Sequence, residues 1–213
     1  MTVAELWSEM DIKLIAILRG ITPDETPEVV RGLLDVGLRA IEIPLNSPDP
    51  ITSIGRAAET AKSYGPSLIG AGTVLAPEQV AQVQGAGGNL IVSPDVNEDV
   101  VSATVQAGMA SFPGVFTATE AHRAIRLGAT GLKFFPASLI GPDGITAIRA
   151  TLPPSVQICV VGGVGPANFA AYRASGVHGF GLGTSLYRPG DSATLVAGRA
   201  RETIDSFRTA YQN

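Results

Sequence analysis

Short apolar runs alternate along the chain with longer segments in which apolar residues recur at helical spacing. Eight such runs are largely uninterrupted by polar residues, and each is followed closely by Gly, Pro or Asn. This pattern is typical of strands that are covered on both faces in a parallel sheet. The sequence therefore predicts strands at residues 14–18, 40–44, 68–72, 90–94, 109–113, 131–135, 157–161 and 179–183.

The segments between the runs predict helices, because they open with Asp, Pro, Asn or Thr and end at Gly. Clear cases are residues 24–37, 76–87, 97–108 and 117–128. One strand and one helix together recur about every 24 residues, which fits a repeated strand–helix unit.

Both ends of the chain also predict helices. From Ser192 to about Tyr211, apolar residues fall on one helical face, as expected of a helix that closes the fold. Residues 1–11, which include Trp7, predict a short helix that covers one end of the sheet.

Eight such units can close into a (β/α)8 barrel or lie open as a doubly wound sheet. An open dinucleotide-binding sheet would carry G-x-G-x-x-G after its first strand, whereas this chain has Leu18-Arg19-Gly20 there. We therefore expect an α/β fold of the TIM-barrel type. A length of 213 residues is at the small end for such a barrel, so we expect one domain over residues 1–213.

Composition and charge narrow the classes of function. A charged fraction of 16% and a mean hydropathy of +0.26 exclude a disordered chain. A net charge of −4 gives no electrostatic footprint for nucleic acid or for an anionic membrane. No apolar run approaches the roughly 20 residues that cross a bilayer, and the N-terminal residues do not resemble a signal peptide.

Cysteine and histidine are scarce. Cys159 is the only cysteine, so the chain has no intramolecular disulfide, and we expect a cytoplasmic location. We interpret Cys159 as a core residue. His122 and His178 lack the spacing of a metal-binding helix, so we expect no metal and interpret both as surface or structural residues.

In a barrel, the side chains at the carboxyl ends of the strands converge on one mouth. Charged groups, hydroxyls and glycines interrupt the apolar pattern at these positions. In chain order they are Arg19, Glu42, Asn46, Thr73, Ser93, Pro94, Pro113, Lys133, Gly162, Gly163, Gly183, Thr184 and Ser185.

Lys133 is the most informative of these residues. It is one of three lysines, against twelve arginines, and lies between Leu132 and Phe134 within a predicted strand. An unpaired ammonium is costly to bury, so the side chain either reaches solvent, forms an ion pair, or has a lowered pKa. An amine with a lowered pKa can attack a ketone and form a Schiff base.

Glu42 and Arg19 each allow two interpretations. Glu42 is either a carboxylate at the sheet edge or paired with an arginine, or a buried carboxyl that shuttles protons near neutral pH. Arg19 either forms a salt bridge with Glu42 or binds a carboxylate or phosphate. A lysine and a glutamate at two strand ends would be complementary, since one forms the iminium and the other moves protons.

Glycine turns suggest an anion site. GAGT at 70–73, VGGV at 161–164 and Gly183-Thr184-Ser185 allow backbone N–H groups to approach an anion. Barrels often bind phosphate at the ends of the seventh and eighth strands, which are two of these positions.

The chain contains, in this order, the strings IAILRGI, AIEIPLNSP, IGAGTVL, KFFPAS, VGGV and GLGTSLYRPG. Together they resemble the class I 2-keto-3-deoxy-6-phosphogluconate and 6-phosphogalactonate aldolase family, over roughly residues 13 to 210. The resemblance implies that Lys133 forms the Schiff base with pyruvate and that Glu42 is the general acid/base. It further implies that Thr73 helps to hold the pyruvate carboxylate and that Gly162, Gly163 and Gly183 bind phosphate.

Two departures separate the branches of this family. Asn46 stands where the gluconate-type enzymes carry an arginine, and Val161 stands where they carry a threonine. Arg19 is the expected replacement for the lost anion contact. Both departures resemble the phosphogalactonate branch. Pro94, Phe135, Thr184 and Ser185 complete the expected substrate-binding set.

The resemblance implies cleavage of 2-dehydro-3-deoxy-6-phosphogalactonate to pyruvate and D-glyceraldehyde 3-phosphate, in a homotrimer and without metal or organic cofactor. Three alternatives stay open. The main substrate could be the 6-phosphogluconate epimer, the protein could be a phosphosugar isomerase or epimerase, or it could be a non-catalytic phosphometabolite-binding barrel. Fold alone does not separate these functions.

Overall fold

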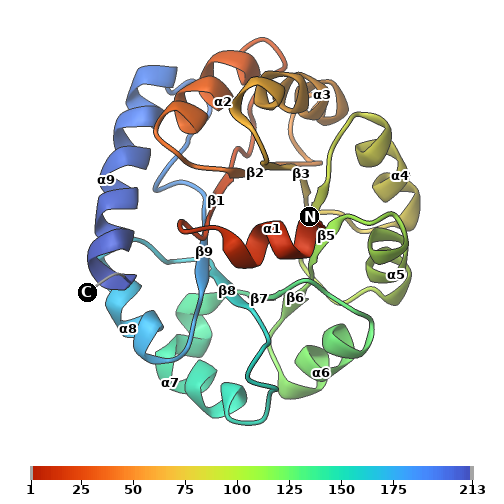
Figure 1. Cartoon of the computed structure of the whole chain (residues 1–213), viewed down its shortest axis with the longest axis vertical. Coiled ribbons are helices and arrows are strands. Elements are labelled where there is room, and N and C mark those ends of the chain that lie inside the picture. Colours follow the sequence, from red (N-terminus) through yellow and green to blue (C-terminus); the bar gives the residue numbers. More distant parts are fainter. Residues whose placement is uncertain (1, 212–213) are drawn as a thin grey trace.

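The computed structural model describes residues 2–211, which form the predicted parallel α/β barrel (Figure 1). Its strands agree closely with the predicted runs. They are β1 (Leu14–Ile17), β2 (Ala40–Pro44), β3 (Leu68–Gly72), β4 (Leu90–Val92), β5 (Ala110–Phe112), β6 (Gly114–Val115), β7 (Leu132–Phe134), β8 (Ile158–Val161) and β9 (Gly179–Leu182).

Nine strands are described where the sequence predicts eight, because Pro113 divides the fifth. All pairs are parallel, in the order β5-β4-β3-β2-β1-β9-β8-β7-β6. β5 pairs with β4, and β6 pairs with β7, so residues 110–115 link the two ends of the sheet and complete the ring. Proline has no N–H for the ladder, but its carbonyl still accepts a hydrogen bond from the Lys133 N–H at 2.9 Å.

The helices form a ring around the strands, except for the first, which lies across one end of the barrel (Figure 1). They are α1 (Val3–Glu9), α2 (Thr26–Asp35), α3 (Pro50–Ala61), α4 (Pro77–Gly85), α5 (Glu98–Gln106), α6 (Ala118–Arg126), α7 (Ala137–Arg149), α8 (Phe169–Ala174) and α9 (Ala193–Tyr211). Two short 3₁₀ helices, η1 (Lys62–Tyr64) and η2 (Pro166–Asn168), complete the described elements. None of the helices within residues 2–211 is both long and apolar enough to span a membrane.

Local signals in the sequence explain where the helices begin. The Asn97 side chain accepts from the N–H groups of Asp99 and Val100 at the start of α5. Thr117 and Glu120 form a reciprocal capping box at the start of α6. A break at Gly141, with φ of 68°, precedes Pro142 and kinks α7.

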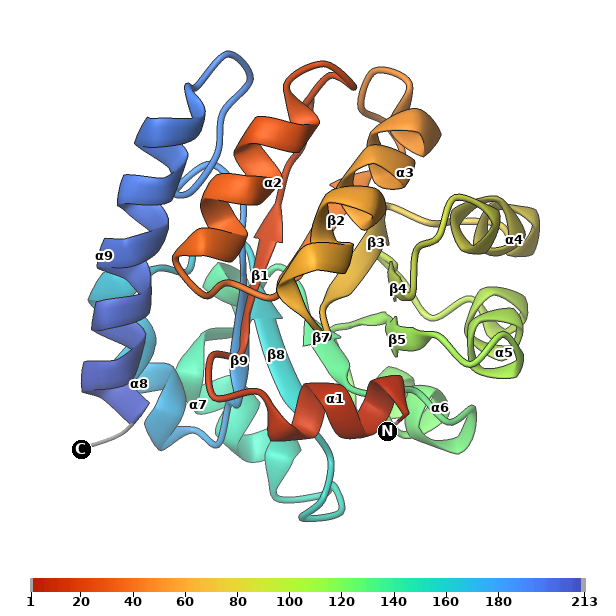
Figure 2. The same cartoon turned by 45° about the horizontal axis from the view of Figure 1, so that its top comes forward.

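Helix α1 closes the end of the barrel at which the strands begin (Figure 2). Trp7 is fully buried there and its ring meets Phe112 edge-on at 4.9 Å. With Trp7, side chains that include Ile15, Leu90 and Cys159 form a small core inside the barrel, whereas the larger core lies between strands and helices. The interior is therefore sealed below and opens at the carboxyl ends of the strands.

The predicted structural role of His178 is confirmed by its contact with β8. The His178 Nδ1 accepts a hydrogen bond from the Ile158 N–H at 3.0 Å. Burial, with smaller effects from the positive charges of Arg149 and Lys13, lowers the pKa of His178 from 6.5. Protonation of Nδ1 removes this acceptor.

The contact therefore predicts a pH dependence of stability. Since the folded-state pKa is lowered, the stabilisation is complete above pH 6.5 and is lost as pH falls below it. His178→Asn, which keeps an acceptor oxygen without titrating, should flatten the fall in the free energy of unfolding between about pH 7 and 5. Urea titrations across this range, with His122→Asn as the control, measure the effect. An equal pH slope in wild type and His178→Asn would show that the contact does not matter.

Candidate active site

Glu42 on β2 and Lys133 on β7 project into the barrel interior and line one narrow cavity near the mouth. Their strand neighbours Ile41, Leu132 and Phe134 belong instead to the outer core, as the alternation of a strand requires. Only 3% of Glu42 and 8% of Lys133 is exposed. Two opposite charges are thus enclosed among apolar side chains.

Burial dominates the chemistry of Glu42. It raises the pKa of this carboxyl to about 7, against the opposing effects of the positive charges of Lys133 and Arg19. Its Oε2 atom is buried and accepts no hydrogen bond from any residue within 2–211. A carboxyl in this state can give and take a proton near neutral pH.

Burial also lowers the pKa of Lys133, to about 8, although the negative charge of Glu42 raises it. The Nζ atom lies 5.2 Å from the centre of the Phe135 ring. The Lys133 side chain is buried and forms no ion pair with another described residue, so both structural alternatives for this lysine are wrong. An amine with a pKa of about 8 is partly unprotonated near neutral pH, and in that form it can act as a nucleophile.

Arg19 follows β1 and is held at the rim by polar side chains rather than by Glu42. Its guanidinium donates to Asn46 Oδ1 and, at 3.5 Å, to Thr73 Oγ1. Among the described residues, Arg19 forms no salt bridge with Glu42, which removes the structural alternative for Arg19. Thr73 has φ of 58°, an unfavourable conformation for a β-branched residue that is typical of functional sites.

A cavity of about 310 Å³ opens beside this rim, between the ends of β8 and β9. Its walls include Arg19, Val161 and the predicted glycines, together with Thr184 and Ser185. Gly163 has φ of 74°, and a Cβ on it would lie 2.7 Å from the Ser138 Cβ. The backbone N–H groups of Gly163, Thr184 and Ser185 donate to no acceptor within residues 2–211, so they are available to an anion.

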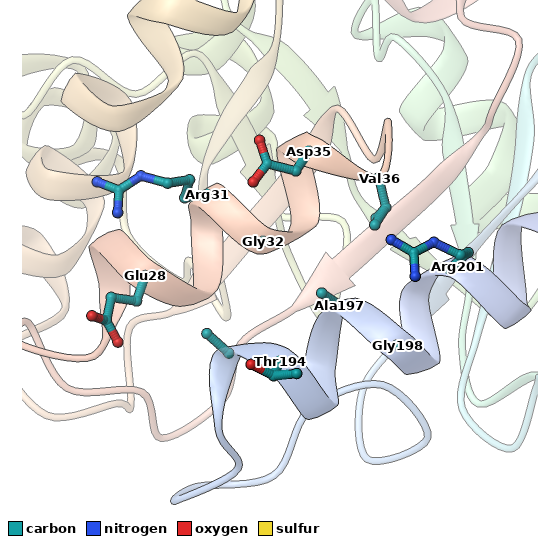
Figure 3. Close-up of a pocket in the computed structure, with 10 residues that line it drawn as sticks. Glu28, Arg31, Gly32, Asp35, Val36, Thr194, Ala197, Gly198 and Arg201 are labelled. Carbon is teal, nitrogen blue, oxygen red and sulfur yellow. The ribbon is translucent and has the colours of Figure 1, made fainter.

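A larger cavity, about 620 Å³, lies elsewhere, in the groove between α2 and α9 (Figure 3). Gly32 and Ala197 lie close together on these helices, and Arg31, Asp35 and Arg201 lie around the groove. The groove lies on helices at the outside of the barrel, whereas barrel chemistry occurs at the carboxyl ends of the strands. The candidate active site is therefore at the mouth, where the narrow cavity of Glu42 and Lys133 and the cavity of about 310 Å³ lie.

Four predicted site residues line neither mouth cavity, but three of them contact residues that do. Phe135 packs beside Lys133, and Asn46 and Thr73 contact Arg19. Pro94 is half-buried after β4 and lines neither mouth cavity.

Three residues at the mouth were not predicted from the sequence. They are Ile17 and Gly181, which line both mouth cavities, and Asp95, whose negative charge raises the pKa of Lys133. The period-two alternation from Ile15 through Ile17 to Arg19 was the signal for Ile17. Within the described part of the chain, no three His, Cys, Asp or Glu side chains gather where they could hold a metal ion.

A buried amine and a buried carboxyl that line one cavity at the mouth of a parallel barrel are the functional groups that a Schiff-base aldolase requires. The chain is a carbon–carbon lyase of this class, and it belongs to the KDPG and KHG aldolase family. Residues 8–191 match the family model "Aldolase: KDPG and KHG aldolase".

Similar proteins agree with this assignment. The "Probable 2-dehydro-3-deoxy-6-phosphogalactonate aldolase" of Rhizobium meliloti (strain 1021) is 53% identical over 204 residues, covering 95% of this chain and 94% of the relative. The "2-dehydro-3-deoxy-6-phosphogalactonate aldolase" of Escherichia coli (strain K12) is 46% identical over 202 residues, covering 94% and 97%. The solved "Native KDPGal structure" superposes with a TM-score of 0.92 at 44% identity, covering 96% and 98%.

The site predicts which lysine reacts with pyruvate. Lys13 donates to the carbonyls of Ser8 and Met10 at the closed end, and Lys62 lies exposed in η1. Borohydride reduction with pyruvate should therefore leave one pyruvyl adduct, on Lys133, as located by mass spectrometry.

The pH dependence of trapping tests the lowered pKa of this lysine. The adduct requires the free amine, so its rate of formation should rise as pH rises to about 8 and then level off. Lys133→Arg keeps the charge without the nucleophile and is the control. An adduct on Lys13 or Lys62, or a rate that still rises toward pH 10.5, would contradict the assignment.

Proposed function

We propose that this protein cleaves 2-dehydro-3-deoxy-6-phosphogalactonate to pyruvate and D-glyceraldehyde 3-phosphate through a Schiff base on Lys133. The observation that carries the proposal is the pairing of Lys133 and Glu42 in one buried cavity, with both pKa values moved toward neutrality. The names of the two relatives at 53% and 46% identity support the galacto configuration of the substrate.

The two ends of the substrate carry anions, and the mouth offers a partner for each. The backbone N–H groups at Gly163, Thr184 and Ser185 bind the phosphate. At the other side, the Arg19 guanidinium and the Thr73 hydroxyl bind the carboxylate that becomes that of pyruvate. Asn46 orients Arg19 through its amide oxygen. In this proposed binding mode, the keto carbon lies near Lys133.

The Lys133 amine attacks the C2 ketone, and loss of water gives an iminium. Glu42, directly or through a water molecule, removes the proton of the C4 hydroxyl. The C3–C4 bond breaks, its electron pair moves into the iminium, and glyceraldehyde 3-phosphate leaves. The enamine is then protonated at C3, and hydrolysis frees pyruvate and the lysine. A carboxyl with a pKa of about 7 serves both proton transfers.

Val161 bears on the choice between the C4 epimers. It lines the mouth cavity, where a valine offers no hydroxyl to bind a substrate hydroxyl. A phosphosugar isomerase or epimerase, by contrast, would need no lysine that forms a Schiff base.

The proposal extends to the assembly and setting of the enzyme. Residues 1–213 act as one catalytic domain, which the family match over residues 8–191 supports. A homotrimer is supported by large apolar side chains that stay exposed in the single chain, such as Phe116 and Leu139. A cytoplasmic location is consistent with the single, unpaired and buried Cys159.

Glu42→Gln tests the proton transfer. The amide keeps the shape of the side chain but cannot exchange a proton, so kcat should fall by about 100-fold or more. The pyruvyl adduct on Lys133 should still form, which shows that the site is intact. Steady-state kinetics with reductive trapping measure both effects. Unchanged turnover would remove Glu42 from the mechanism.

Assays of the two C4 epimers test the substrate. The galacto epimer should have the higher kcat/KM. Val161→Thr adds a hydroxyl beside the substrate and should reduce the galacto-to-gluco ratio of kcat/KM by about 10-fold. Val161→Ala, which adds no hydroxyl, is the control. Equal kcat/KM values for both epimers in the wild type would show that Val161 does not discriminate.

A further inference from the structure

Gly72, the last residue of β3, lies against the carboxyl group of Glu42. A Cβ placed on Gly72 would be 2.0 Å from Glu42 Oε2, 2.4 Å from Cδ and 2.5 Å from Oε1. These are the three atoms nearest to that position, and all of them belong to the carboxyl group. The space that any other residue would fill at position 72 is occupied by the carboxyl of Glu42.

The backbone conformation at position 72 does not by itself require a glycine. Its φ lies outside the positive range, where glycine is favoured, and it pairs in register with Pro44 on β2 and Val92 on β4. Its carbonyl accepts a hydrogen bond from the Leu45 N–H at 2.9 Å. An L-residue can adopt this extended conformation, so the demand for glycine comes from the neighbouring side chain.

Gly70, two residues earlier on the same strand, shows a different constraint. A Cβ there would lie 1.9 Å from the carbonyl oxygen of Leu90. The neighbouring strand excludes a side chain at position 70, whereas the Glu42 carboxyl excludes one at position 72. The two glycines therefore make a matched pair for an experiment.

We propose that Gly72 is a positioning residue for catalysis: its missing side chain forms the slot that holds the Glu42 carboxyl facing Lys133. The buried Oε2 atom has no hydrogen-bond partner among residues 2–211 to fix it in place. Packing against Gly72 therefore sets its position. A methyl group at position 72 forces the carboxyl out of the slot while Lys133 keeps its place on β7. The proposal rests on the proposed role of Glu42 in proton transfer.

The first test measures activity in two backgrounds. In the wild type, Gly72→Ala should lower kcat by about 100-fold, as expected for a catalytic group displaced by about 1 Å. The pyruvyl adduct on Lys133 should still form, and KM should change far less than kcat. In the Glu42→Gln background the same change should cause no further loss, because proton transfer is already gone. Wild-type kcat in Gly72→Ala, or an equal loss in both backgrounds, would overturn the proposal.

The second test measures the packing without reference to activity. Gly72→Ala should lower Tm in the wild type but not in the Glu42→Ala background, where the truncated side chain leaves room for the new methyl group. Gly70→Ala, the control, should be destabilising in both backgrounds. If Gly72→Ala alone does not fold, a soluble Glu42→Ala/Gly72→Ala double variant with the Tm of Glu42→Ala carries the same conclusion. A double variant that loses Tm as much as the single one overturns it.

The two tests separate this proposal from the function on which it rests. Full turnover in Glu42→Gln would reject Glu42 as the proton carrier, while the Tm result would still report the packing. An inactive Glu42→Gln together with a fully active Gly72→Ala would reject only the positioning role of Gly72.

Discussion

The site depends on burial of an amine and a carboxyl in the same apolar interior. Water would keep Lys133 protonated, and so unable to attack a ketone, and would leave Glu42 a weak base with a pKa near its ordinary value. The barrel removes that water, which moves the pKa of Lys133 down to about 8 and that of Glu42 up to about 7. Their mutual attraction opposes both shifts, and the effect of burial is the larger of the two.

Much of the fold serves this burial. Helix α1 places the fully buried Trp7 under the strands, and the interior core of Ile15, Leu90, Phe112 and Cys159 fills the space between Trp7 and the charged pair. At the mouth, the donors of Arg19 and the glycine turns face the 310 Å³ cavity, where two substrate anions bind in our proposal. The apolar side chains at the closed end keep Glu42 and Lys133 buried, and the hydrogen-bond donors at the mouth are available to bind the substrate.

The sequence predicts the barrel well because each strand is a short apolar run and each helix carries its own start and stop signals. It also predicts the chemistry of Lys133 and Glu42, since charges within apolar strands are conspicuous. The division of the fifth strand at Pro113 is different, because it depends on how the two ends of the sheet meet. Gly72 is also beyond sequence reasoning. A glycine in a strand can be required by backbone, by a neighbouring strand or by a side chain, and only three-dimensional packing distinguishes these cases.

The claim that burial sets the proton chemistry can be tested directly by titrating Glu42. Carbon-13 NMR of the wild-type enzyme labelled at its glutamate carboxyl carbons, with the Glu42 signal assigned by its loss in Glu42→Gln, follows this group alone. The account predicts a midpoint near pH 7. A midpoint near the ordinary value of 4.5 would contradict it, because burial would then not control the proton affinity of this carboxyl.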